Sequence, residues 1–82
     1  MSGRPVKHSV TLKGHRTSVS LENEFWHELR ALADQKSMAI NALVAEIDIS
    51  RNPDVGLASA IRVYVLKSIL AARDVAARTS GY

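Results

Sequence analysis

The stretch that decides the fold is Val6-Lys7-His8-Ser9-Val10-Thr11-Leu12-Lys13-Gly14-His15-Arg16-Thr17-Ser18-Val19-Ser20-Leu21. Polar positions alternate in it with apolar or β-branched ones, at the period of two that a β-strand requires. Gly14 interrupts the alternation, so a tight turn at Lys13-Gly14 predicts a hairpin. The facing pairs would be Val10 with Thr17, His8 with Val19 and Val6 with Leu21.

This hairpin would have two chemically different faces. The mainly apolar face collects Val6, His8, Val10, Leu12, Thr17, Val19 and Leu21. The opposite face carries bases and hydroxyls, namely Lys7, Ser9, Thr11, Arg16, Ser18 and Ser20. Residues 6–13 are equally compatible with a flexible arm that orders on binding, so both alternatives stay open for this first half.

The hydrophobic period becomes helical after Leu21. A first amphipathic helix has Asn23 as its expected N-cap and the apolar positions Phe25, Leu29, Leu32 and Ala33. The pattern breaks at residues 35–37 and then resumes in a second helix with Ile40, Leu43, Val44 and Ile47. The two helices are therefore joined tightly.

A third helix follows the turn-forming run Asn52-Pro53-Asp54-Val55-Gly56. Its main apolar stripe consists of Leu57, Ile61, Tyr64, Val65 and Ile69. Further apolar positions widen that stripe beyond what one small monomer covers: Val63, Leu66 and Leu70. This width predicts a contact with another protein surface.

The length of 82 residues allows one domain. We expect it to span residues 6–78, with a flexible N-terminus at 1–5 and a frayed C-terminus at 79–82. A chain this short buries only about 60% of its unfolded surface, which favours a partner subunit. There is no cysteine and no apolar run of roughly 18 residues, so the sequence predicts a cytoplasmic protein without disulfides or a membrane span.

Positive charge is concentrated at the beginning of the chain. Net charge is +3, yet the segment before Glu22 contains Arg4, Lys7, Lys13, Arg16 and no acid. Such asymmetry is typical of proteins that bind a polyanion, although a solvated basic tail gives the same pattern.

The groups that catalysis or metal binding needs do not converge. His27-Glu28 lacks the second histidine of a metalloprotease helix, and no glycine-rich phosphate loop follows a strand. In the hairpin, His8 and His15 would be about 13 Å apart, too far to share one metal ion. We therefore expect neither an enzyme nor a bound cofactor or metal.

The chain resembles the ribbon-helix-helix family in the order and spacing of three runs: His15-Arg16-Thr17-Ser18-Val19-Ser20-Leu21-Glu22, then Phe25-Trp26 with Leu29, then Met38-Ala39-Ile40-Asn41-Ala42-Leu43-Val44. The segment 7–70 is similar to a bacterial branch with an added first strand and a third helix. The resemblance implies a mostly α fold with a short β-ribbon, built as an intertwined homodimer that places the ribbon in the major groove of double-stranded DNA.

The resemblance also implies site residues. Arg16, Ser18 and Ser20 match the base-facing positions of the family strand. Asn41 and Ala42, together with Ile40, match the helix start that holds a DNA phosphate, and Lys7 and Lys13 would add phosphate contacts. The implied dimer core comprises Val19, Leu21, Phe25, Leu29, Ile40, Leu43, Val44 and Ile47.

Two departures from the family pattern affect these expectations. Ala39 stands where a capping Ser or Thr is usual, so we expect Ser37 to cap the second helix one turn earlier. If residues 6–13 pair as an extra strand, a dimeric ribbon has four strands with outer axes about 14 Å apart, which is wide for a major groove of roughly 12 Å.

The sequence therefore supports two candidate functions of different classes. The first is a sequence-specific DNA-binding protein, a small bacterial transcriptional regulator that acts as a homodimer. The second is a protein-interaction module, antitoxin-like or an adaptor, that holds another protein on the third helix through Val63, Leu66 and Leu70.

Overall fold

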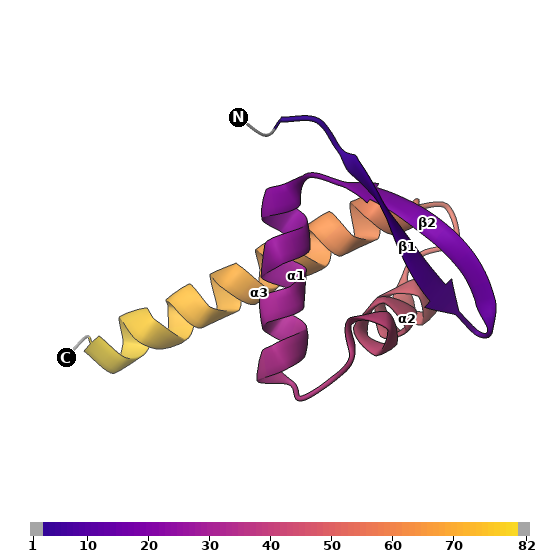
Figure 1. Ribbon diagram of the computed structural model, residues 1–82. Coiled ribbons are helices and arrows are strands. Elements are labelled where there is room, and N and C mark those ends of the chain that lie inside the picture. The colour runs from indigo at the N-terminus through magenta and orange to yellow at the C-terminus, as the bar shows by residue number, and fades with distance from the viewer. Residues whose placement is uncertain (1–2, 81–82) are drawn as a thin grey trace.

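The fold begins with a two-stranded antiparallel hairpin of β1 (Val6–Leu12) and β2 (His15–Leu21). Three helices follow: α1 (Asn23–Gln35), α2 (Ile40–Ser50) and α3 (Leu57–Ser80) (Figure 1). The structure is a computed structural model that describes residues 3–80, with side chains to residue 76. The expected flexible and frayed ends at residues 1–2 and 81–82 lie outside the described residues, so the domain boundaries stay predictions.

The predicted hairpin and its register are confirmed. Val6 pairs with Leu21, His8 with Val19 and Val10 with Thr17. The turn residues Lys13 and Gly14 have φ values of 52° and 80°. Positive φ at both central residues defines the type I′ turn, whose twist matches that of the flanking strands. Residues 6–12 are therefore a paired strand and not a loose arm.

Helix α1 begins one residue earlier than its expected cap predicted. Glu22 is the N-cap, with extended backbone at φ −61° and ψ 147°, and Asn23 is already helical. The prediction of Asn23 as N-cap was wrong, because the extended backbone ends at Glu22, one residue earlier than that prediction required. Glu22 makes no side-chain cap hydrogen bond, since its carboxylate is engaged by Arg62 of α3.

The junction between α1 and α2 also differs from expectation. Ser37 has φ 56°, and its N–H donates to the Asp34 carbonyl at 3.0 Å while Met38 N–H donates to Ala33 O at 2.9 Å. This hydrogen-bond pair is the Schellman motif that closes a helix C-terminus. The prediction that Ser37 caps α2 was wrong. Ala39 is the N-cap of α2 and forms no side-chain cap.

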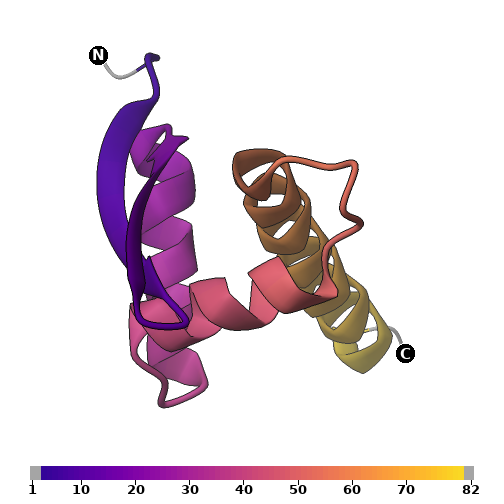
Figure 2. The same cartoon turned by 90° about the vertical axis from the view of Figure 1, so that its right-hand side faces the viewer.

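The core lies between the inner face of the hairpin and the three helices. Its buried side chains are Val10, Val19, Leu21, Leu29, Ala33, Leu43, Val44, Ile47, Ile61 and Val65. Figure 2 shows the hairpin on the left, α3 on the right and α2 running between them. One chain thus pairs its own strands and covers the apolar faces of α1 and α2 with α3.

The residues expected in a dimer core are placed in this single-chain core. Six are buried here, whereas Phe25 and Ile40 are half-buried and pack against the cluster. Their part in an interface between two chains stays a prediction. Among residues 3–80, no helix combines the length and apolar character that a membrane span needs.

Candidate nucleic-acid interface

The outward face of the hairpin gathers polar side chains from both strands. We call it the reading face, and it consists of Lys7, Ser9, Thr11, Arg16, Ser18 and Ser20, all of them exposed. The register places Lys7 opposite Ser20, Ser9 opposite Ser18 and Thr11 opposite Arg16. Sequence reasoning expected base contacts from Arg16, Ser18 and Ser20, and β1 adds hydroxyls directly beside them.

The reading face is cationic and carries no acid. Lys7 lies near one end of the hairpin, while Lys13 in the turn and Arg16 lie toward the other. At the usual strand rise, Lys7 and Lys13 are about 20 Å apart along β1. The ion pairs of the described residues involve Arg51 and Arg62 instead. The three bases of the hairpin are therefore available to an anion.

The N-terminus of α2 is attached to the hairpin. Thr11 N–H donates to Asn41 Oδ1 across 3.4 Å, at the outer edge of β1. The first backbone hydrogen bond of α2 is donated by Leu43 N–H to the carbonyl oxygen of the N-cap, Ala39, at 3.1 Å. The amides of residues 40–42 precede it and have no carbonyl partner within the helix. These amides form a partial positive charge beside the turn end of the hairpin.

The structure therefore brings some of the expected phosphate contacts together and separates another. Asn41, Ala42 and Lys13 lie at the turn end of the hairpin, whereas Lys7 lies at its opposite end. The Asn41 side chain already accepts the Thr11 amide. A phosphate at this helix start would then bind the backbone amides rather than the Asn41 amide group.

His8 has a structural environment that sequence reasoning missed. Its ring stacks on Trp26 with a centroid distance of 4.0 Å and an interplanar angle of 7°. Among the described residues, buried His8 Nε2 has no hydrogen-bond partner. Burial, with the positive charges of Arg30 and His27, lowers the pKa of His8. The sequence did contain a signal for this environment, because His8 is a polar residue on the apolar face of the hairpin. It lies two residue pairs away from the end of β2 that leads into α1.

The two histidines of the hairpin do not share a site. His15 pairs with Leu12 beside the turn, far along the sheet from His8. In the described part of the chain, no three of the His, Cys, Asp and Glu side chains gather as metal ligands. The reading face thus offers cationic and hydroxyl groups rather than a metal centre.

Comparison with known proteins agrees with this geometry. A family model described as a ribbon-helix-helix domain matches residues 5–69, which include both strands, α1, α2 and half of α3. The chain belongs to the ribbon-helix-helix family. This family consists generally of DNA-binding transcriptional regulators and not of enzymes, and its members typically bind DNA as dimers. No curated protein and no solved structure matches the chain.

This ribbon-helix-helix chain has a second exposed surface, on α3. Val63, Leu66 and Ile69 are 48%, 53% and 45% exposed, while Leu70 is half-buried. Beside them lies an apolar hollow of about 220 Å³, lined by Phe25, Arg62, Val63, Val65, Leu66 and Ile69. The predicted exposure of the third helix is confirmed for Val63 and Leu66.

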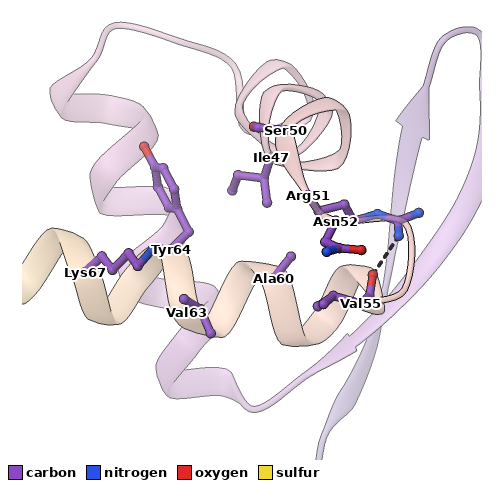
Figure 3. A pocket seen from close by; sticks show the side chains of 9 residues that line it. All are labelled: Ile47, Ser50, Arg51, Asn52, Val55, Ala60, Val63, Tyr64 and Lys67. Carbon is purple, nitrogen blue, oxygen red and sulfur yellow. Dashed lines mark hydrogen bonds between the residues drawn. The ribbon is translucent and has the colours of Figure 1, made fainter.

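A larger open pocket of about 400 Å³ lies between α2 and α3 (Figure 3). Arg51 fixes its wall, because Nε donates to Asp48 Oδ1 at 2.8 Å and Nη1 donates to the Val55 carbonyl at 2.6 Å. Its remaining lining is formed by Ile47, Ser50, Asn52, Ala60, Val63, Tyr64 and Lys67. Because these two hydrogen bonds hold its guanidinium, we infer that Arg51 stabilises the loop before α3 and does not bind a ligand.

An ion pair fixes α3 to the junction of β2 and α1. Arg62 Nε and Nη2 donate to the two Glu22 carboxylate oxygens at 2.9 and 3.3 Å. The hydrogen bonds from Arg62 hold the pKa of Glu22 below its ordinary value. The same guanidinium lies 5.9 Å from the Phe25 ring centroid. These contacts set how α3 lies against the base of the hairpin.

Proposed function

We propose that this chain is a sequence-specific DNA-binding transcriptional regulator, acting as a homodimer in the bacterial cytoplasm and not as an enzyme. The observation that carries the proposal is the reading face. A ribbon-helix-helix chain presents six exposed polar side chains on one side of a rigid hairpin, with bases among them and no acid. A two-stranded ribbon is narrow enough for the major groove, where each base pair has its own donor and acceptor pattern.

Arg16 has the leading part in base recognition. A guanidinium matches guanine O6 and N7 bidentately, and the exposed Arg16 has no ion pair with a described residue. Ser18 and Ser20 lie on the same strand face and supply hydroxyls that accept from or donate to any base. Selectivity therefore depends mainly on Arg16.

Phosphate contacts supply affinity without selectivity. Lys7 and Lys13 neutralise backbone charge at the two ends of the hairpin, and the uncapped amides of Asn41 and Ala42 suit a phosphate oxygen. Because neutralised phosphates release counterions, binding should weaken steeply as salt concentration rises.

The test separates the preference for one DNA sequence from the overall affinity for DNA. A duplex is first selected from a randomised pool on the wild-type protein, and affinities for it and for a random duplex are then compared at two salt concentrations. Arg16→Ala should lower the preference for the selected duplex by about tenfold. Lys7→Ala should weaken both duplexes about equally and flatten the salt dependence.

Arg73→Ala is the matched control, because it removes the same charge from an exposed position on α3. Its affinities should equal those of the wild type. Failure of the wild type to bind any duplex at low salt would remove the proposed function. Equal losses on both duplexes for Arg16→Ala would remove Arg16 from base recognition but leave DNA binding in place.

A second candidate function is supported by the apolar surface of α3. Val63, Leu66 and Ile69 lie exposed beside the 220 Å³ hollow, as a protein partner held by an antitoxin-like or adaptor module would require. Leu66→Glu tests this surface by light scattering after gel filtration. Conversion of a wild-type dimer to a monomer would show that a second copy of the chain covers this surface. The protein-interaction function would then lose its docking site. An unchanged oligomeric state leaves α3 free for another protein.

A further inference from the structure

β1 is held to the body of the protein and not only to β2. Val10 is 1% exposed in the core, and His8 stacks on Trp26 at 4.0 Å. The Thr11 amide is taken up by Asn41 of α2. Detaching β1 would expose Val10, break the stack and leave one full edge of β2 without hydrogen bonds. We therefore expect β1 to stay paired with β2 when the protein binds DNA.

The width of the paired sheet limits which strands reach the bases. Among residues 3–80, the second edge of β2 has no neighbouring strand, so a homodimer that pairs these edges has the strand order β1-β2-β2-β1. With strands about 4.8 Å apart, the β2 axes lie about 2.4 Å and the β1 axes about 7 Å from the centre of that sheet. The half-width of the major groove is roughly 6 Å. The two β2 strands therefore fit between the groove walls, whereas each β1 strand lies over the phosphate backbone at the rim.

The reading-face side chains of β1 suit a phosphate backbone. Lys7, Ser9 and Thr11 are all exposed on this face, and they span about 14 Å at the usual strand rise. An ammonium group and two hydroxyls are groups that donate to phosphate oxygens. β1 contains no acid that would repel a phosphate.

This row of donors continues into the start of α2. Thr11 N–H donates to Asn41 Oδ1 across 3.4 Å, which places the end of the row beside the amides of residues 40–42. Those amides have no carbonyl partner within the helix, and the helix dipole adds partial positive charge there. β1 and the N-terminus of α2 therefore present donors to the same stretch of DNA backbone.

We propose that β1 is a phosphate-binding strand, which stays paired with β2 on the rim of the major groove and contacts the backbone through Lys7, Ser9 and Thr11. The β2 strands of two chains read the bases between the two rims. This inference rests on the proposed DNA-binding homodimer. It assigns Ser9 and Thr11 to affinity without sequence preference, although they lie directly beside Ser18 and Arg16 in the sheet.

A disulfide lock tests whether β1 stays paired. The chain has no cysteine, so Val10→Cys with Thr17→Cys introduces one facing pair on the side opposite the reading face. Hydrogen-bonded facing residues have Cα atoms about 5.5 Å apart, within the range that a disulfide spans. The oxidised and reduced forms of the same protein should bind each duplex with the same affinity. A loss of binding on oxidation that reduction restores would show that β1 must detach, and would overturn the inference.

Hydroxyl deletions test which part of the DNA β1 contacts. Ser9→Ala and Thr11→Val should each weaken binding to the selected and the random duplex by the same factor, about twofold to tenfold, and leave the preference unchanged. Ser18→Ala removes the hydroxyl that faces Ser9 on β2, and it should instead lower the preference for the selected duplex. Thr17→Val is the matched control for Thr11→Val, because it removes a hydroxyl from the other side of the hairpin. It should change neither affinity.

The outcomes separate this inference from the function on which it rests. If the wild type binds no duplex, the proposed function fails. If the wild type binds and the β1 variants lose preference for the selected duplex, β1 contacts bases; if they leave both affinities unchanged, β1 contacts no DNA. Either result overturns the inference and leaves the DNA-binding function in place. Equal losses on both duplexes, with a lock that does not impair binding, support β1 as a phosphate-binding strand.

Discussion

At the scale of single residues, Ser37 has a left-handed backbone conformation that residues with a side chain rarely adopt. Its φ of 56° closes α1, in a position that glycine usually occupies because it lacks a Cβ. Ser37→Gly should raise the free energy of unfolding by about 0.5–1 kcal/mol. Urea denaturation followed by circular dichroism measures the change.

The control for Ser37 is the same substitution within a helix. Ser59→Gly, at an exposed position in α3, should lower the free energy of unfolding by about 0.5–1 kcal/mol because glycine is a poor helix former. Destabilisation by both substitutions would contradict the left-handed conformation of Ser37.

His8 makes stability depend on pH. Its pKa is lowered from 6.5 in the folded protein by burial and by the charges of Arg30 and His27, so the unfolded chain takes up the proton first as pH falls. The stability that neutral His8 contributes is fully present above the pKa of His8 in the unfolded chain. It is lost as pH falls from that value through the lower pKa of His8 in the folded protein. Between pH 7.5 and 5, the wild type should lose more free energy of unfolding than His8→Phe, which keeps a ring against Trp26.

Urea unfolding at both pH values checks this expectation. The two proteins differ only at residue 8, so the difference between their pH profiles reports on His8. Parallel pH profiles of the wild type and His8→Phe would show that the stacked ring of His8 carries no proton-linked stability.

At the scale of elements, the hairpin turn contains Lys13, to which the proposed function assigns a phosphate contact. Lys13 occupies the first left-handed position of the type I′ turn, where asparagine is strongly preferred. Lys13→Asn should keep or raise the stability of the fold while weakening DNA binding and reducing the salt slope by about 0.9. Thermal unfolding and salt-dependent anisotropy measure the two effects, with Lys67→Asn on α3 as the charge control.

The start of α2 lacks a side-chain cap. Ala39 has the extended backbone of an N-cap, at φ −67° and ψ 147°, but no oxygen to accept an amide. Ala39→Ser should therefore raise the free energy of unfolding by about 1 kcal/mol. An unchanged unfolding midpoint in urea would mean that other groups already satisfy the amides of residues 40–42.

The sequence predicted the elements better than their ends. Alternation and Gly14 set the strand register, because a slip of one residue would turn Val10 and Val19 away from the core. Asn23 and Ser37 were wrong as caps because cap identity depends on local backbone angles, which neighbouring residues and tertiary contacts such as Glu22 with Arg62 influence. The His8 stack on Trp26 likewise depends on how α1 packs under the hairpin.

At the scale of the whole molecule, one chain meets the needs that sequence reasoning assigned to a second copy. β1 gives β2 its neighbouring strand, and α3 adds Ile61 and Val65 to the core. Burial of Val19 and Leu21 therefore needs no partner. The hairpin and α3 also lie on different sides of the molecule (Figure 2). DNA and a protein partner would then occupy separate surfaces.

Cross-linking distinguishes a ribbon shared by two chains from a hairpin that acts alone. Two copies joined through their β2 edges would run antiparallel and bring residues near the middle of β2 close to their counterparts. Ser18→Cys and Ser20→Cys, each alone in a chain without other cysteines, would then form disulfide-linked dimers on mild oxidation.

We expect a disulfide-linked dimer band from both variants on a non-reducing gel, because the proposed homodimer would bring the two β2 strands side by side. The Val10→Cys and Thr17→Cys pair shows under the same conditions that oxidation is effective, through a disulfide within one chain. Monomers alone for both Ser18→Cys and Ser20→Cys would instead show that the two β2 strands do not lie side by side, and a homodimer would then have to form through another surface.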